Sequence, residues 1–204
     1  MKKLIVTTLL VLSSTAVNAN SLSIIDSTAI TFSGYNGQPA LYTGARSAGF
    51  LGAISADFAG TITATYLGNE SGDNNRFRFE VGNSLNEMDS IGSTINRNIA
   101  AGIVDFRFRD TTTGGVFVNG SPNLAGATLS YAILDGILNP ARSYTNYGPF
   151  DFLIGFNDNG SGDTDYDDFV VGLRFAPSEV PIPASIPLMA SAIGLFAFGK
   201  RRGV

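Results

Sequence analysis

The chain has 204 residues and contains neither cysteine nor histidine. These two absences exclude disulfide bonds, thiol nucleophiles, serine–histidine–aspartate triads and zinc sites built on histidine or cysteine. All 17 acidic residues and 8 of the 13 basic residues lie between positions 20 and 179, which gives this segment a formal charge of −9. Such a segment repels phosphate backbones and anionic lipid, so nucleic acid is not an expected partner, whereas cations are attracted.

The first 19 residues have the layout of a secretory signal peptide. Lys2 and Lys3 precede an apolar run at positions 4–12, and residues 17–19 form a small-x-small cleavage site. A helix belonging to the folded domain would need an amphipathic face, which this run lacks. We therefore predict an N-terminal signal helix at residues 1–19, removal of this segment after Ala19, and an exported mature protein.

Residues 20–176 contain short strand patterns separated by Gly, Asn, Asp and Ser. The segment at 76–82 alternates phenylalanine and valine with arginine and glutamate, and the segment at 104–109 repeats this alternation. Further strand-like segments lie at positions 61–67, 115–120, 127–134, 151–156 and 169–175. Together with 24 glycines and no strong helical period, they predict an all-β domain, namely an antiparallel, jelly-roll-like β-sandwich.

The strand pattern is interrupted by a polar run at residues 68–75. By composition alone, this run is a loop that connects two strands. In the alternative interpretation, the run lies beside a second polar segment further along the chain. It would then add Glu70, Asp73 or Asn75 to a shared metal or polar site.

That second segment is rich in aspartate, with six aspartates and no basic residue between positions 151 and 168. Mutual repulsion of these carboxylates destabilises the fold unless solvent or a cation screens them. Calcium binds about six to eight oxygens from carboxylates, amides, backbone carbonyls and water. We predict a calcium site formed by Asp158, Asp163, Asp165, Asp167 and Asp168. The alternative is a polar hairpin in which Asp and Asn side chains cap their own turn.

Two functional classes fit the aspartate-rich segment poorly. The spacing of Asp163, Asp165 and Asp167 matches the start of an EF-hand loop, but the sixth position is Asp168 and the twelfth is Arg174, instead of Gly and Glu. Glycoside hydrolysis needs two carboxylates that flank a sugar bond, an arrangement that acids crowded on one turn do not provide. We therefore predict that the protein is not an enzyme.

The chain ends in a proline-containing apolar segment followed by a basic cluster. Residues 180–199 carry no charge and would span about 30 Å as a helix, which is the thickness of a bilayer core. Pro181, Pro183 and Pro187 restrict a helix to the second half of this stretch. The basic cluster at 200–202 places the domain outside and the C-terminus in the cytoplasm. A C-terminal transmembrane-like helix is therefore expected.

This tail resembles the PEP-CTERM family of bacterial sorting signals, in its Val-Pro-x-Pro variant. Ile182 stands where Glu is usual in the family. The matching residues are Val180, Pro181 and Pro183, then the apolar segment, and finally Lys200, Arg201 and Arg202. Two short motifs in the body, residues 66–72 with Asn75 and residues 163–168, are similar to elements common in exported proteins with such tails.

The resemblance implies recognition by an exosortase, a membrane processing enzyme of Gram-negative bacteria that also make extracellular polysaccharide. The tail would hold the protein at the inner membrane, with the domain outside, until it is cut near Val180 and Pro181. The body would then pass to the cell surface or the extracellular matrix. The chain is thus divided into a signal peptide (1–19), a β-sandwich (20–176) and a sorting signal (177–204).

The expected function is that of a non-enzymatic surface or biofilm-matrix protein stabilised by calcium. The alternative is a carbohydrate-binding module for exopolysaccharide, because jelly rolls often bind sugars. Such a module needs an exposed aromatic patch, for which Tyr144 and Tyr147 are the candidates. A glycosidase or lyase would require two well-separated carboxylates across a cleft.

Overall fold

The computed structural model describes residues 22–31, 48–123, 129–135, 147–158 and 166–178. Twelve strands and no helix occur in these residues, so the predicted all-β fold is confirmed for this part of the chain. The helices predicted at the two ends of the chain lie outside the described residues, as does the whole segment 179–204.

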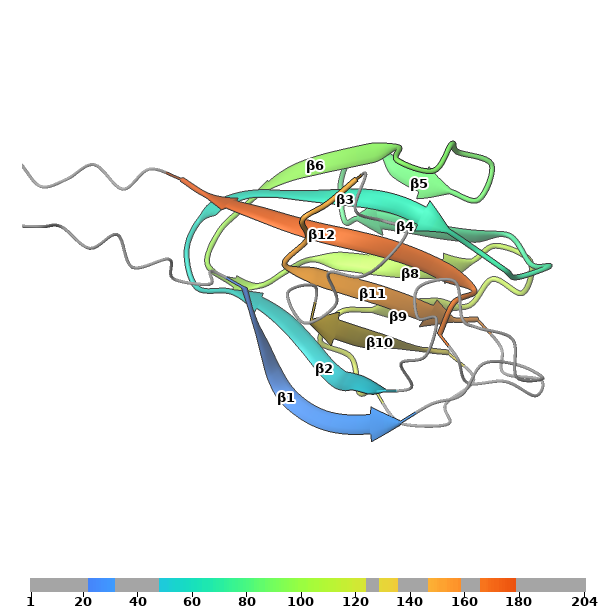
Figure 1. The fold of residues 1–204 in the computed structure, drawn as a ribbon, viewed down its shortest axis with the longest axis horizontal. Helices are drawn as coiled ribbons and strands as arrows, with labels where there is room; N and C mark the ends of the chain where they lie inside the picture. The colour runs from blue at the N-terminus through green and yellow to red at the C-terminus, as the bar shows by residue number, and fades with distance from the viewer. Residues whose placement is uncertain (1–21, 32–47, 124–128, 136–146, 159–165, 179–204) are drawn as a thin grey trace, which may run out of the picture.

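The strands form two antiparallel sheets (Figure 1). Sheet A contains β1 (Leu22–Thr31), β2 (Ala48–Ala56), β3 (Gly60–Gly68), β6 (Thr94–Ile99), β7 (Gly102–Ile103), β10 (Ser130–Asp135), β11 (Phe152–Asn157) and β12 (Phe169–Pro177). Its order is β1-β2-β10-β11-β12-β3-β6, with β7 paired to β2. Sheet B contains β4 (Asn75–Phe79), β5 (Ser84–Asn86), β8 (Phe106–Asp110) and β9 (Val116–Val118), in the order β5-β4-β8-β9.

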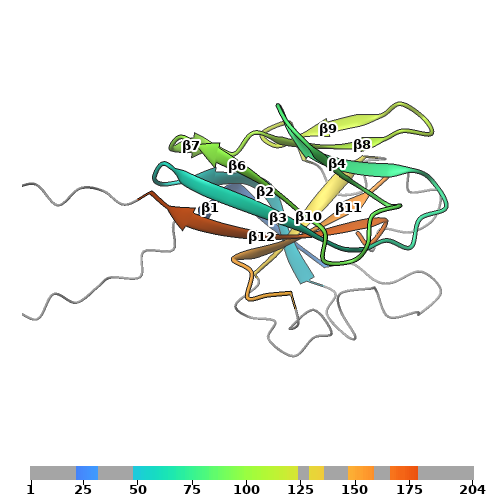
Figure 2. The same cartoon turned by 90° about the horizontal axis from the view of Figure 1, so that it is seen from above.

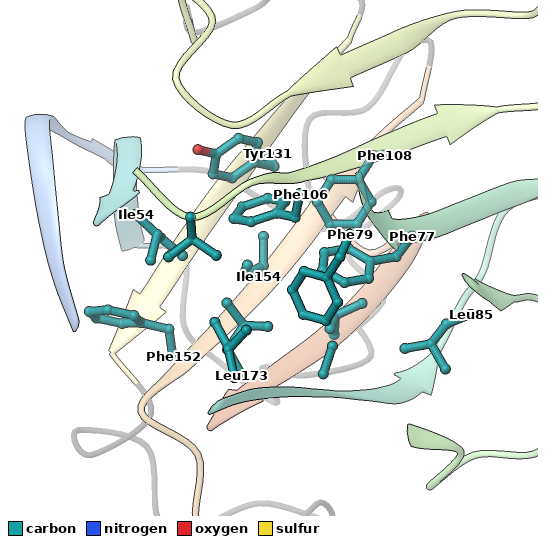
Figure 3. Packing of buried hydrophobic residues seen from close by; sticks show 14 of the residues in the cluster. Ile54, Phe77, Phe79, Leu85, Phe106, Phe108, Tyr131, Phe152, Ile154 and Leu173 are labelled. Carbon is teal, nitrogen blue, oxygen red and sulfur yellow. The ribbon is translucent and has the colours of Figure 1, made fainter. Parts of the chain in front are cut away.

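The two sheets lie in separate layers (Figure 2), and an aromatic core fills the space between them. Phe77 and Phe79 of β4 and Phe106 and Phe108 of β8 are buried, as the alternating sequence pattern predicted (Figure 3). The rings of Phe108 and Phe156, a residue of β11, stack with centroids 4.7 Å apart and an interplanar angle of 3°. The structure is therefore a two-layered, β-sandwich-like domain.

A second apolar cluster covers the other face of sheet A. Leu153 of β11 and Val170 of β12 belong to this cluster, together with Phe150 and Tyr166 from the flanking loops. All six residues of β11 are buried. The strands predicted at 151–156 and 169–175 are thus present, and they carry apolar residues on both sides because sheet A is covered on both faces here.

Asn119 links the two sheets through buried hydrogen bonds. Its Oδ1 accepts a hydrogen bond from the Ile54 amide at 3.0 Å, and its Nδ2 donates to the carbonyl oxygens of Ile54 at 2.8 Å and Val104 at 2.6 Å. The Tyr131 hydroxyl lies 2.7 Å from the same Oδ1, and burial raises the pKa of this hydroxyl. The Asn119 side chain thus gives β2 the hydrogen-bond partners that a neighbouring strand would supply.

Candidate functional site

The two polar segments identified in the sequence meet at one end of sheet A. One of them joins β3 to β4, and the other joins β11 to β12. β12 pairs antiparallel with β3, with Val170 opposite Gly68, and β11 pairs with β12, with Phe156 opposite Phe169. The end of β3, the end of β11 and the start of β12 therefore share one edge of the sheet, and this strand pairing brings the two loops together.

Asp158 lies at the centre of this junction. Ser71 Oγ and Asn75 Nδ2 each donate a hydrogen bond to Asp158 Oδ2 at 2.6 Å. The Glu70 amide donates to the backbone carbonyl of Asp167 at 3.2 Å. Asp158 and Asn75 are only 7% and 2% exposed. The predicted alternative in which the two segments lie side by side is therefore the one observed, although Glu70 makes this link through its backbone.

Glu87 also belongs to the junction, although it was not predicted from the sequence. Its Oε1 accepts a hydrogen bond from the Asn75 amide at 2.8 Å. Burial raises the pKa of Glu87, hydrogen bonds from Asn75 oppose this shift, and the charges of Asp158 and Asp73 add to it. Arg76 pairs with Asn86 in the β4–β5 hairpin, which places Glu87 beside Asn75. Knowledge of this register would have revealed Glu87.

Asp168, the last residue of the aspartate-rich segment, contacts Asp158. Asp168 Oδ2 accepts a hydrogen bond from the Asp158 amide at 2.8 Å, a bond of the kind that the polar-hairpin alternative predicts. Asp167 and Asp168 are both buried. Tyr166 has a backbone φ of 60°, in the left-handed region that residues other than glycine seldom adopt. Its buried ring packs into the second apolar cluster.

The described residues do not form a metal site by themselves. Within the ranges that the structure describes, no three acidic side chains converge closely enough to hold a metal ion. Asp163 and Asp165 lie outside these ranges. However, Asn75 Oδ1 is buried and has no hydrogen-bond partner among the described residues. A buried amide oxygen normally has a partner, and a donor set made only of oxygen atoms suits calcium.

Carboxylates also lie near Tyr66, beside the junction. Burial raises the pKa of Tyr66 to about 12, with further contributions from the negative charges of Glu87 and Asp89. The Tyr66 hydroxyl forms a hydrogen bond with Asn69 Oδ1, and its ring stacks on Phe169 with centroids 4.8 Å apart. Because these carboxylates affect a neighbouring phenol, the same field would attract a cation.

Tyr147, one of the two candidate aromatic residues for sugar binding, lies on the surface. Its side chain is 45% exposed. The ring rests on Gly92, where an added Cβ would lie 2.4 Å from Tyr147 Cε1. Gly92 also has a φ of +94°, so a larger residue there would disturb both the backbone and the ring. The second candidate, Tyr144, lies outside the described residues.

Comparison with known proteins does not assign a family. No protein-family model matches the chain, and a search of curated proteins finds no match. In the described part of the chain, no helix is long and apolar enough to cross a membrane; positions 180–199 are not in that part. The functional argument therefore depends on the residues of this chain alone.

Proposed function

We propose that the protein is a non-enzymatic, exported surface or matrix protein whose β-sandwich is stabilised by calcium where residues 68–75 meet residues 158–168. The observation that carries the calcium proposal is the environment of Asp158. Its carboxylate is buried, its two hydrogen-bond donors among the described residues are neutral, and it lies close enough to Glu87 to raise the pKa of that residue. Two carboxylates placed in this way repel each other unless a cation neutralises them.

The proposed ligands come from both loops. The described residues would contribute the carboxylate of Asp158 and the unpartnered Oδ1 of Asn75. The remaining oxygens would come from the predicted residues Asp163 and Asp165, which lie outside the described residues; the predicted ligands Asp167 and Asp168 do not converge with Asp158 into an acidic group that could hold a metal ion. When bound, calcium would supply positive charge and a cross-link between the β3–β4 and β11–β12 loops. It would have no catalytic role.

Calcium titration of the full-length chain by calorimetry tests this proposal. We expect one calcium ion per chain, bound with a dissociation constant of about 0.1–1 mM, as in extracellular calcium modules. Asp158→Asn should weaken binding about tenfold or more, because a carboxylate ligand is lost. Asp57→Asn removes the same charge at an exposed position outside both loops and should leave the affinity unchanged. Absence of binding to the wild-type chain at millimolar calcium would refute the proposal.

The proposed route to the surface depends on the two ends of the chain. It is supported by the order of the signal peptide, the jelly-roll-like domain, the Val-Pro-x-Pro motif, the apolar segment and the basic end. The mass of the protein recovered from the cell surface tests this route. We expect a species that lacks residues 1–19 and ends near Val180. A surface protein that still ends at Val204 would mean that the tail is an ordinary anchor.

A carbohydrate-binding module is the second candidate function, favoured by the exposed ring of Tyr147. Aromatic rings on protein surfaces stack against apolar faces of ligands. A glycan array probed with the full-length chain should detect such binding, and Tyr147→Ala should reduce the signal. An array without any bound glycan would remove this second candidate and leave the calcium proposal unaffected.

A further inference from the structure

The outward face of sheet B carries four arginines in two cross-strand pairs. Arg76 lies opposite Arg109, and Arg78 lies opposite Arg107, on the paired strands β4 and β8. The phenylalanines that alternate with them are buried between the sheets, so the arginines project from the opposite face. These four residues, here called the arginine face, are half of the eight basic residues between positions 20 and 179.

Two carboxylates, Glu80 and Asp105, lie near Arg107 at one end of the arginine face. Like charges directly opposite each other destabilise an antiparallel pair of strands. Arg76 Nε donates a hydrogen bond to Asn86 Oδ1 at 2.7 Å, but this amide is neutral. Arg107 Nη2 lies 3.9 Å from Glu80 Oε1, which is longer than a hydrogen bond. Arg107 Nε is buried and has no partner among the described residues. The four arginines outnumber these two carboxylates, so the face retains net positive charge.

The arginines form two rows across the paired strands β4 and β8, in the manner of a grid. Neighbouring strands lie about 4.8 Å apart, and residues on the same face of one strand repeat about every 6.8 Å. Val116 and Val118 of β9 lie opposite Arg109 and Arg107, so each row ends in an apolar side chain. Val116 is 45% and Val118 is 36% exposed. In Figure 2, β4, β8 and β9 form the outer layer on their side of the molecule.

We propose that the arginine face binds an anionic polysaccharide through its carboxylate or sulfate groups. The planar fork of a guanidinium group matches these oxyanions and binds them through two parallel hydrogen bonds. A polymer of identical sugar units repeats its anionic groups at regular intervals, as the grid requires. Val116 and Val118 would contact the apolar faces of the sugar rings. Arg76 directly follows Asn75 of the Asp158 junction, but successive side chains of a strand point to opposite faces, so the two sites use opposite faces of β4.

The net charge of the segment that carries the arginine face favours one type of anionic polymer. The segment 20–179 has a formal charge of −9, so a densely charged nucleic-acid backbone is repelled at long range. A polysaccharide with one anionic group per sugar ring has a lower charge density and suffers less repulsion. An acidic polypeptide would need a special sequence to present carboxylates at regular intervals. These arguments favour the polysaccharide over the other two classes of macromolecule.

Binding of the full-length chain to immobilised polymers tests the proposal. The probes are polygalacturonate for carboxylate groups, dextran sulfate for sulfate groups, uncharged dextran as the control, and polyglutamate as an acidic polypeptide. We expect binding to polygalacturonate or dextran sulfate, none to dextran, and weakening as salt is raised. Arg78→Gln combined with Arg107→Gln should reduce the affinity about tenfold or more, because two charge-assisted contacts are lost.

Matched variants separate this site from general charge effects. Arg174→Gln removes an exposed arginine from β12 in sheet A and should change the affinity less than about twofold. Arg78→Lys combined with Arg107→Lys keeps the charge and should restore part of the affinity. A thermal melt of each variant confirms that it is folded. The proposal is wrong if neither anionic polysaccharide binds, if the double glutamine variant binds as tightly as the wild type, or if polyglutamate binds equally well.

Discussion

The outer faces of the two sheets differ in composition and in what covers them. On sheet A, Leu153 and Val170 lie beneath Phe150 and Tyr166. On sheet B, the corresponding positions hold the arginine face, in which Arg109 is exposed. Strands of sheet A that are buried on both sides must be apolar throughout, whereas strands of sheet B alternate. The covered face therefore contributes stability, and the open face is available for a ligand.

The largest expected change in stability follows from removal of the Phe150 ring, which covers the outer face of sheet A. Phe150 is 9% exposed and packs on the outer face of sheet A, so Phe150→Ala should lower the free energy of unfolding by about 3–5 kcal/mol. Arg109→Ala on the open face should change it by less than about 0.5 kcal/mol. Urea unfolding followed by circular dichroism measures both values. Equal costs for the two substitutions would contradict the contrast between the faces.

Gly172 provides a smaller test of the same packing. A Cβ added at this position would lie 2.7 Å from ring atoms Cδ1 and Cε1 of Phe150. Gly172→Ala must therefore displace the ring and should cost about 1–3 kcal/mol of unfolding free energy. The same urea unfolding experiment measures this loss of unfolding free energy. In the Phe150→Ala background the added methyl group finds space, so the second substitution should then cost much less.

The pH dependence of Glu87 is the smallest predicted effect. Burial raises the pKa of this carboxyl above its ordinary value of 4.5, so the folded state binds the proton more tightly than the unfolded state. Its favourable contribution to stability is present at low pH and is lost as pH rises through the raised pKa. Without calcium, Glu87→Gln should therefore be more stable than the wild type at pH 7, by less than about 1 kcal/mol.

Thermal melts in calcium-free buffer measure this difference at several pH values. The advantage of Glu87→Gln should shrink as pH falls toward 4.5, where the wild-type carboxyl becomes protonated. The glutamine keeps the oxygen that accepts a hydrogen bond from the Asn75 amide, so this bond is retained in the variant. A difference that stays constant between pH 7 and pH 4.5 would show that the charge of Glu87 is not responsible.

Sheet B was the part of the fold most readily predicted from the sequence. Only one face of β4 and β8 is buried, so their phenylalanines and arginines alternate with the period of a strand. The strands β11 and β12 were found in the sequence, but the burial of β11 and of residues 169–173 of β12 on both faces was not predicted. It depends on Phe150 and Tyr166, which cover sheet A from the loops. Short sequence patterns do not encode such long-range packing.

The candidate site was predicted in part, for a similar reason. The two polar segments were recognised by composition, and their meeting was one of two alternatives. The pairing of β12 with β3 decides between these alternatives, because it brings both loops to one sheet edge. Glu87 and Asn119 were missed, since their roles depend on the β4–β5 register and on the contact between the sheets.

The most direct test of the proposed calcium site is the melting temperature of the full-length chain in 10 mM calcium and in excess chelator. Ligand binding to the folded state raises stability in proportion to the logarithm of ligand concentration over the dissociation constant. For a site of extracellular affinity, we expect calcium to raise the melting temperature by about 3–10 °C. Asp158→Asn should lose most of this increase. Identical melting temperatures of the wild-type chain in calcium and in chelator would contradict the account.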